Sequence, residues 1–468
     1  MSFKQNHITA AICAALLTCS FSAQAEMVFR KGNGAEPQSL DPQIAEGVPS
    51  SNILRDLFEG LTSEDAAANV IPGLAESWDI SEDGLTYTFH LRDALWSDGQ
   101  AITAEDVIYA WQRAVDPAVG SNYSFILYPI KNAEAITKGE VAVTELGARA
   151  LDDKTVEVTL EGPTPYFIGL LTHATAYPVP KHVIEQHGDQ WTRKENLVSS
   201  GAFKISEWIP QSKIELNKSD TYWDKAVVKL DKVIYYPTED ENSELKRYRS
   251  GELDLTNTVP SSQLKWVKDN LADELKIVPT LGVEYYGFNL SKEPFKDNLK
   301  LREALNLAID RKILTEKILG AEQIPAYSIV VPGINGYEGY KPEWSTLDDK
   351  ARIEKARALY AEAGYSKDKP LKVKLLYNTS DGHKTNANAI RAMWKEVLGV
   401  DTETNNEEWK VFLNTRKQRN TEVFRAGWQG DYNDPNTFLD LFASSSELND
   451  LSLKIQNLTH YSKKLGRN

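Results

Sequence analysis

The chain has 468 residues, of which 41% are apolar and 10% aromatic, an ordinary composition for a globular protein of more than one domain. It carries 53 basic and 67 acidic side chains, so its formal net charge is −14. The two signs are interspersed along the chain, which argues against nucleic acid and anionic lipid as partners.

Residues 1–25 have the features of a cleaved secretory signal. The apolar run Ile8–Leu17 is too short for a stable membrane anchor, and Ala23-Gln-Ala25 forms an Ala-x-Ala cleavage site. We therefore expect a soluble, exported mature chain that begins at Glu26.

Both cysteines of the chain, Cys13 and Cys19, lie within this signal. The mature protein is therefore expected to have no thiol, no disulfide and no thiolate metal site. The alternative is a lipoprotein acylated at Cys19, which Thr18 disfavours because a smaller residue usually precedes the acylated cysteine.

Extended segments, strands and one capped helix are predicted in the first part of the mature chain. Gly47 and Pro49 argue against a regular helix, so Glu46–Val48 is expected to be extended, before a helix over Asn52–Phe58. Period-two alternation predicts a strand over Leu85–Arg92. A capping box at Thr103-Ala-Glu-Asp106 then opens a helix.

Further strands and the first helices after them are expected from residue 201 onwards. Helices are expected to begin near Ser243 and Ser261. The expected strands are Ala202–Trp208, Lys213–Asn217, Tyr222–Trp223 and Lys232–Tyr236.

Beyond Gly282 the pattern changes to helices and a β-α-β unit. Helices are predicted over Leu301–Leu319 and Lys350–Ala363. The unit consists of a strand over Leu371–Tyr377, an amphipathic helix and a strand over Val400–Thr404. The pattern predicts two α/β lobes joined by extended segments, with a ligand site in the cleft between them.

One stretch near the end of the chain has the composition of a binding edge. It follows a predicted strand over Thr421–Arg425, and glycines at 427 and 430 would allow a ligand to approach the backbone closely. Trp428 offers a large ring face and Asp431 a carboxylate. The alternative interpretation is a strand that runs into a turn, with Asp431 capping the bend at residues 433–435.

The sequence shows no pattern of catalytic residues that would support an enzyme. It has no Gly-x-Ser-x-Gly elbow, no His-Glu-x-x-His helix and no phosphate-binding loop. His182 and His187 are five residues apart, which favours surface histidines over a metal site. Asp431 and Asp434 could form an acid/base pair, but the turn at Pro435 is expected to point them apart.

Several longer motifs resemble the periplasmic solute-binding proteins of ABC transporters for peptides, the family that includes oligopeptide- and dipeptide-binding proteins (solute-binding protein family 5, peptide/nickel type). The resemblance extends from about residue 30 to about residue 446. Its motifs are Gly73-Leu-Ala-Glu-Ser-Trp78, Tyr87-Thr-Phe-His-Leu-Arg92, Trp96-Ser-Asp-Gly99, Tyr222-Trp223, Arg247-Tyr-Arg-Ser-Gly251 and Arg425-Ala-Gly-Trp428.

The resemblance implies an α/β, two-lobed, type II periplasmic-binding-protein-like fold with an extra smaller domain. It places the first lobe at 26–61 and 190–281, the extra α/β domain at 62–189, the second lobe at 282–450 and an atypical tail at 451–468. In the family, an extended peptide is enclosed between the lobes and pairs as an added strand, while its side chains lie in roomy, hydrated pockets.

The resemblance also assigns roles to individual residues. Asp431 matches the carboxylate that pairs with the α-ammonium of the peptide. The two backbone edges beside the peptide are Glu46, Gly47 and Val48, and Gly427, Trp428 and Gln429. The cations for the ligand's C-terminal carboxylate are Arg416, Arg425 and His383, and the pocket walls are Tyr123, Asn257, Tyr286, Trp409 and Trp428. The alternatives are a solvated helix face for Arg416 and a plain helix N-terminal residue for His383.

Three departures from the family leave the preferred length and charge of the ligand open. A disulfide at the rim of the cleft would fall at Gly282 and Gln429, a further cleft acid at Gly287, and a lysine used for longer ligands at Leu319. The ending from Leu451 onwards also departs from the family. We expect a truncated C-terminal part that lacks the helices and strand returning to the first lobe, with lower stability and weaker binding.

The sequence thus predicts a monomeric periplasmic receptor without catalysis or cofactor that delivers short peptides to an inner-membrane ABC permease. Alternatives within the family are receptors for murein peptides, dipeptides, haem or nickel. Alternatives from other classes are an exported hydrolase and a chaperone-like protein that binds unfolded chains.

Overall fold

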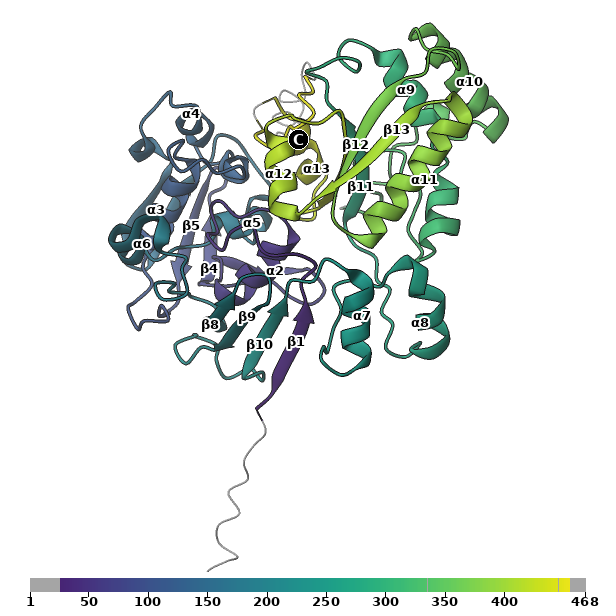
Figure 1. The fold of residues 1–468 in the computed structure, drawn as a ribbon. Helices are drawn as coiled ribbons and strands as arrows, with labels where there is room; N and C mark the ends of the chain where they lie inside the picture. Colours follow the sequence, from purple (N-terminus) through teal and green to yellow (C-terminus); the bar gives the residue numbers. More distant parts are fainter. Residues whose placement is uncertain (1–25, 335, 445, 455–468) are drawn as a thin grey trace, which may run out of the picture.

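The computed structural model describes residues 26–334, 336–444 and 446–454. Within these residues the strands form three four-stranded sheets and one two-stranded sheet, and helices cover them on several sides (Figure 1). The predicted signal at 1–25 and residues 455–468 of the atypical tail lie outside the described part. No helix of the described residues has both the length and the apolar character of a membrane span.

The first sheet joins a strand at residues 28–32 to a region about two hundred residues later. Its order is β1-β10-β9-β8, and β1 runs parallel to β10 with Val28 opposite Lys232. The strands are β1 (Val28–Gly32), β8 (Phe203–Ile209), β9 (Lys213–Lys218) and β10 (Lys232–Tyr236). Two helices follow this sheet, α7 (Glu241–Arg249) and α8 (Leu264–Asn270).

The predicted strand at Tyr222–Trp223 is wrong, because these residues lie in the connection between β9 and β10. The Trp223 indole donates a hydrogen bond to Glu59 at 2.6 Å, and the Arg92 guanidinium lies 3.6 Å above its ring centroid. The two aromatic residues therefore tie the first sheet to its neighbours instead of extending a ladder.

The prediction that Gly47 and Pro49 exclude a helix is also wrong. Helix α2 (Val48–Leu57) begins at Val48, with Pro49 in its first turn and Gly47 as the N-cap residue. Proline is tolerated there because the first amides of a helix have no intrahelical acceptor to lose. Glu46 and Gly47 precede the helix as a loop, whereas Val48 belongs to it.

The extra α/β region is a second four-stranded antiparallel sheet covered by helix α3 (Ala104–Val115). The backbone amide of Thr103 donates to the Asp106 carboxylate at 2.9 Å, which confirms the predicted capping box. The sheet strands are β4 (Ala75–Ile80), β5 (Thr86–Leu91), β7 (Thr155–Thr159) and β6 (Ala148–Asp152). The shorter elements are β2 (Thr62–Glu64), β3 (Val70–Pro72), α4 (Ala133–Thr137), α5 (Phe167–Leu170) and α6 (Lys181–His187).

The third sheet has the order β11-β14-β12-β13 and contains the predicted β-α-β unit. Strands β12 (Lys372–Asn378) and β13 (Asp401–Glu407) are parallel and are connected by α11 (Asp381–Leu398), which confirms that prediction. Strands β11 and β14 pair antiparallel along their full lengths, β11 (Gly282–Phe288) and β14 (Val423–Gln429). Helices α9 (Leu299–Leu307) and α10 (Asp349–Glu362) lie on the same side as α11 (Figure 1).

The helix predicted over Leu301–Leu319 is divided into α9 and a π-helical turn over Ile313–Leu319. The Asp310 carboxylate accepts a hydrogen bond from the Ile313 amide at 3.0 Å. This local side-chain hydrogen bond competes with the backbone hydrogen bonds of a continuous helix, so a separate helical turn begins at Ile313.

We call the part of the chain before β11 the N-terminal half. Helices α12 (Trp409–Lys417) and α13 (Asn436–Leu439) lie between this half and the other side of the third sheet, as Figure 1 shows. One large hydrophobic core spans the first two sheets and another fills the third. Tyr432 belongs to the first of these cores although it follows β14, so the two halves pack together at this point. The residue boundaries given for the domains stay a prediction.

Candidate functional site

Most of the predicted site residues lie where the end of β14, the start of α11 and helix α12 meet the N-terminal half. The rings of Tyr123 and Trp428, from opposite halves, are stacked with centroids 6.0 Å apart. Trp428 packs against the large N-terminal core and against a small cluster around Val283 and Phe438. Asn257 is exposed, and its neighbours are Gly34 and Glu244, to whose carboxylate its backbone amide donates a hydrogen bond.

The Asp431 carboxylate lies buried at the C-terminal end of β14 without a charged partner in the described structure. Its nearest cation candidate is His173, whose Nε2 is 3.6 Å from Oδ1, and its Oδ2 has no hydrogen-bond partner among the described residues. Burial, together with the nearby Asp440 carboxylate, raises the pKa of Asp431 to about 8. A bound cation would relieve this cost.

The alternative role of Asp431 as the cap of the following bend is not what the structure shows. Asp434 accepts the hydrogen bond from the Asn436 amide at 2.9 Å, and Asp431 contributes only its backbone amide, to Thr437 at 3.0 Å. The carboxylate of Asp431 therefore does not cap the bend.

His173 is a site residue that the sequence did not reveal. Its Nδ1 accepts a hydrogen bond from the Thr175 amide at 3.3 Å, so its Nε2 carries the proton and faces Asp431. Burial, with Arg55 nearby, lowers the pKa of His173 to about 3, and its ring stacks on Tyr123 at 4.8 Å. His173 therefore presents a neutral N–H to Asp431 and no compensating charge.

Strand β14 has a free backbone side next to Asp431. β11 pairs with all of it, but β12 pairs only through Leu375 with Val423 and Leu376 with Phe424. On that second side, residues 425–429 have no strand partner among the described residues. Gly427 lies in this stretch, so the backbone is accessible to another extended chain.

Glu46 and Gly47, two further predicted site residues, approach α12 closely. A Cβ placed on Gly47 would lie 2.4 Å from the Trp409 ring, and the φ of Gly47 is +79°, which favours glycine. The Glu46 carboxylate accepts a hydrogen bond from the Asn122 amide, and burial raises its pKa. The structure thus brings Gly47 and Trp409 together, although they come from different halves of the chain.

Arg425 and His383 form one polar cluster with Glu284, a residue absent from the sequence-based site. Arg425 Nη2 contacts Glu284 Oε2 at 3.0 Å, and His383 Nδ1 lies 3.1 Å from the Asn378 carbonyl oxygen. Burial and the adjacent Arg425 lower the pKa of His383. His383 does occupy the first turn of α11, whose N-cap is Ser380, but it also belongs to this cluster.

Arg416 does not lie on a solvated helix face. Its side chain is 13% exposed, and its Nη2 pairs with Asp450 Oδ2 at 2.7 Å. The guanidinium lies over the rings of Phe412 and Phe424, with centroid distances of 5.4 and 4.9 Å. The sequence contained no local signal for this ion pair.

Buried polar atoms without a hydrogen-bond partner are concentrated at these residues. Such atoms are rare in native proteins because each one costs free energy, and a cluster of them often marks a place where a ligand supplies the missing bonds. Within the described residues, five of the predicted site residues have one: Asp431 Oδ2, Arg416 Nε, Arg425 Nε, Tyr286 Oη and Trp409 Nε1.

The three departures from the family also have clear positions in the structure. Gly282 and Gln429 are directly opposite each other on β11 and β14, and Thr280 Oγ1 donates to Gln429 Oε1 at 2.8 Å. A Cβ on Gly287 would lie 2.7 Å from both Leu451 and Phe424, so Leu451 occupies the space beside it. Leu319 ends the π-helical turn after α9.

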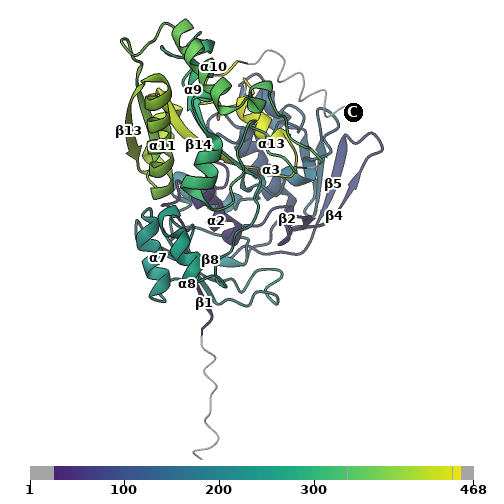
Figure 2. The same cartoon turned by 90° about the vertical axis from the view of Figure 1, so that its right-hand side faces the viewer.

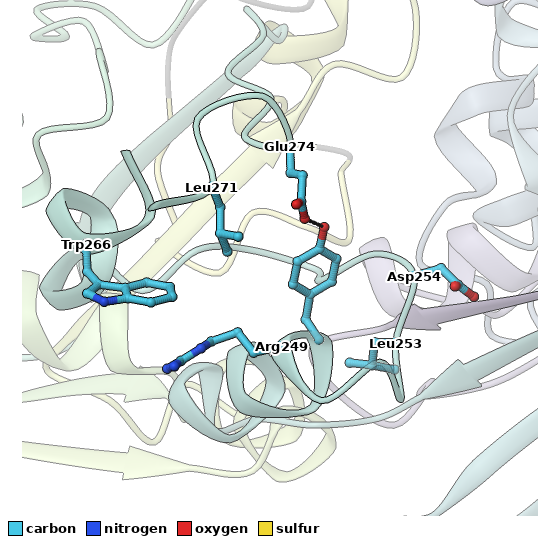
Figure 3. A pocket seen from close by; sticks show the side chains of 7 residues that line it. Arg249, Leu253, Asp254, Trp266, Leu271 and Glu274 are labelled. Carbon is cyan, nitrogen blue, oxygen red and sulfur yellow. Dashed lines mark hydrogen bonds between the residues drawn. The ribbon is translucent and has the colours of Figure 1, made fainter. Parts of the chain in front are cut away.

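Two cavities in the described part of the protein differ in their position relative to the predicted site residues. A cavity of about 200 Å³ lies between the two halves and is lined by Gln38, Ile44, Glu46, Val119, Gly120, Asn122, Lys410, Leu413, Asn414 and Lys417. A groove of about 440 Å³ lies between α7 and α8, where Arg249 stacks on Trp266 and Tyr248 bonds Glu274 (Figure 3). None of the predicted site residues lines this second groove.

No group of three or more potential metal-ligating side chains is arranged to hold a metal ion in the described residues. His182 contacts Asp98 at 2.7 Å, and His187 ends helix α6. The described site therefore consists of a backbone edge, aromatic walls and single charges.

Comparison with known proteins places this arrangement in a family. Residues 69–450 match the model described as bacterial extracellular solute-binding proteins, family 5 Middle. The periplasmic oligopeptide-binding protein OppA of Escherichia coli (strain K12) is 43% identical over 465 residues, which cover 96% of this chain and 85% of that protein. The crystal structure of Haemophilus influenzae OppA in complex with the peptide RPPGFSPFR has a TM-score of 0.90 and 38% identity, covering 94% of this chain and 86% of that chain.

A third relative distinguishes between two arrangements of the lobes. The structure of the Escherichia coli murein tripeptide-binding protein MppA has a TM-score of 0.92 at 35% identity and covers 95% of this chain and 87% of that chain. Its unliganded open form has a TM-score of only 0.62, with 94% and 88% covered. The halves described here are therefore arranged as in the former structure, and these similarities confirm the expected type II periplasmic-binding-protein fold. The chain belongs to the bacterial extracellular solute-binding proteins of family 5.

Proposed function

We propose that this protein is a periplasmic receptor that captures short peptides in the cleft between its lobes and delivers them to an inner-membrane ABC importer. It acts as a monomer, without a cofactor and without chemical change to the ligand. The family, the periplasmic relatives and the predicted signal at residues 1–25 support this proposal.

The observation that carries the proposal is the free side of β14, with the Asp431 carboxylate at its end. An extended peptide placed along residues 425–429 would satisfy backbone groups as an added strand. If its amino end lies at Asp431, it runs antiparallel to β14 toward Arg425. At roughly 3.3 Å per residue, this stretch matches a ligand of about four or five residues.

The unpaired carboxylate of Asp431 favours ligands that have a free amino terminus. A buried carboxylate without a partner is costly, and an ammonium at hydrogen-bond distance would convert that cost into a favourable ion pair. The same argument disfavours haem and nickel, because neither presents an ammonium group.

Main-chain pairing accounts for tolerance of different side chains. Hydrogen bonds to the peptide backbone give affinity without reading the sequence, and walls such as Tyr123, Trp409 and Trp428 offer broad ring faces. Changes in a ligand side chain are therefore expected to alter affinity less than methylation of a ligand backbone nitrogen, which removes a donor.

The first test combines Asp431→Asn with acetylation of the ligand. Calorimetry with tri- to pentapeptides should show that the substitution weakens binding of free peptides by about 2–5 kcal/mol, because a buried ion pair is lost. Acetylated peptides should bind the wild type weakly and be nearly indifferent to the substitution. Equal binding of free and acetylated peptides by the wild type would refute the role of Asp431.

A murein peptide is the second candidate ligand, supported by the similarity to MppA. Titration with a murein tripeptide beside an alanine tripeptide separates the two, since a dedicated murein receptor would bind only the former. Mass spectrometry of the recovered peptide distinguishes capture from hydrolysis, because a receptor returns its ligand intact.

A further inference from the structure

The ion pair between Arg416 and Asp450 lies beside β14, because the Arg416 guanidinium is 4.9 Å from the ring centroid of Phe424 in that strand. Arg416 is in the last turn of α12, and both side chains are largely buried, at 13% and 14% exposure. Leu413 and Lys417, the neighbours of Arg416 on α12, line the cavity between the two halves together with Glu46. The pair therefore belongs to the surroundings of the proposed ligand and not to a distant surface.

Asp450 is held in position by the segment 446–453. Asn449 fixes this segment through its side chain, which donates to the carbonyl of Leu453 at 2.8 Å and accepts from the Leu453 amide at 3.0 Å. The Leu451 carbonyl accepts from the Leu290 amide at 3.0 Å, and the Leu451 side chain packs beside Gly287. Asp450 is therefore a built-in acid and not a mobile surface residue.

The charge of Arg416 is already balanced within the protein. At 2.7 Å, the pair is a charge-assisted hydrogen bond between oppositely charged groups shielded from water. A second carboxylate that approached Arg416 would be repelled by Asp450 and would find the guanidinium neutralised. Arg416 Nε, by contrast, is buried without a partner among the described residues, so a neutral acceptor such as a peptide carbonyl can still bind there.

We propose that Asp450 is a specificity-determining residue: it neutralises Arg416, so that this arginine binds peptide carbonyls and does not select a C-terminal carboxylate. The inference rests on the proposed function and deepens it. The receptor recognises the amino end of the ligand through the unpaired Asp431. At Arg416 it binds a peptide that extends past this position or that ends there in an uncharged group.

The test uses Asp450→Asn in the full-length protein, because asparagine keeps the shape and removes the charge. Trialanine, tetra-alanine and penta-alanine are titrated by calorimetry, each as the free acid and as the C-terminal amide. The variant should gain about a tenfold preference for the free acid at the length that brings the carboxylate to Arg416, as one charge pair is worth about that factor. The matched control is Asp310→Asn, which removes a similarly buried partner, that of Arg352, outside the cleft.

Two results would overturn the inference. One is an unchanged acid-to-amide ratio at every length in Asp450→Asn. The other, which needs no folded Asp450 variant, is a wild-type preference for the free acid that disappears in Arg416→Gln. Failure of the wild type to bind any of the six ligands would refute the proposed function itself, so the two failures are distinguishable.

Discussion

Asp431 combines burial, a missing partner and a neutral histidine neighbour in one residue. Because burial raises its pKa to about 8, the carboxyl holds a proton for much of the time near neutral pH when no cation is beside it. His173 cannot compensate, since its own pKa is lowered to about 3. The unpaired carboxylate is therefore costly to the fold, and the ligand ammonium proposed to bind beside it would offset that cost.

This arrangement predicts that binding of a peptide ammonium releases a proton. The ion pair favours the charged carboxylate, so the pKa of Asp431 should fall below neutral when the ligand binds, and up to about one proton per peptide should leave near pH 7. Affinity should accordingly rise as the pH increases from about 5 to about 8, the point at which the peptide amino group begins to lose its own proton.

Calorimetry in buffers with different ionisation enthalpies measures this proton release. Asp431→Asn should abolish it, whereas Asp401→Asn, which changes an exposed acid at the start of β13, should not. Binding by the wild type without any proton exchange would mean that Asp431 is already ionised.

At the scale of elements, the start of α2 and the start of α12 meet at a single close contact. Gly47 is the N-cap of α2, and the Trp409 ring fills the space that a side chain at position 47 would need. The contact brings the loop before α2 against the start of α12. Sequence order gives no indication of it, because the two helices are in different halves of the protein.

Gly47→Ala should therefore weaken peptide binding as well as stability. The positive φ alone costs roughly 1 kcal/mol for alanine, and the overlap with Trp409 must push α12 away from the loop. The control is Gly251→Ala, where φ is +80° but no atom lies within 4 Å of the added Cβ. Thermal melts should show a lower melting temperature for both variants, whereas calorimetry should show weaker peptide binding only for Gly47→Ala. Equal peptide affinities of the two variants would contradict a role of this contact in binding.

At the scale of the molecule, α7 of the N-terminal half contacts the first turn of α11 in the other half. The Glu241 carboxylate accepts hydrogen bonds from Ser380 Oγ at 2.6 Å and from the Gly382 amide at 3.3 Å. Asn242 donates to Asp381 at 2.8 Å. Figure 2 shows α7 and α8 beneath the second lobe. These bonds stabilise the arrangement in which the halves are together.

Glu241→Ala should shift the protein toward a more open arrangement. Losing two hydrogen bonds at a partly buried contact is expected to cost about 1–3 kcal/mol of closure. Small-angle scattering without peptide should show a larger radius of gyration, and stopped-flow measurements a faster release of bound peptide. Glu252→Ala removes an exposed acid paired with Arg247 inside one segment, so it should change neither quantity. An unchanged radius and release rate in Glu241→Ala would show that this contact does not hold the lobes together.

The sequence alone determined the features that depend on neighbouring residues. Alternation and caps are local, so the β-α-β unit around α11 and the capping box at Thr103 were predicted correctly. Long collinear motifs were sufficient to identify the family. Asp431 could be selected because two glycines, a tryptophan and a turn surround it in the chain itself.

The tertiary structure decided what depends on distant partners. Pro49 became part of α2, Trp223 became a hydrogen-bond donor to Glu59, and Leu301–Leu319 was divided at Asp310. His173 beside Asp431 and Asp450 beside Arg416 could not be predicted, because such pairs are brought together only by packing. Burial then sets whether a charge is free to bind or already neutralised, and burial is a property of the folded chain and not of a local pattern.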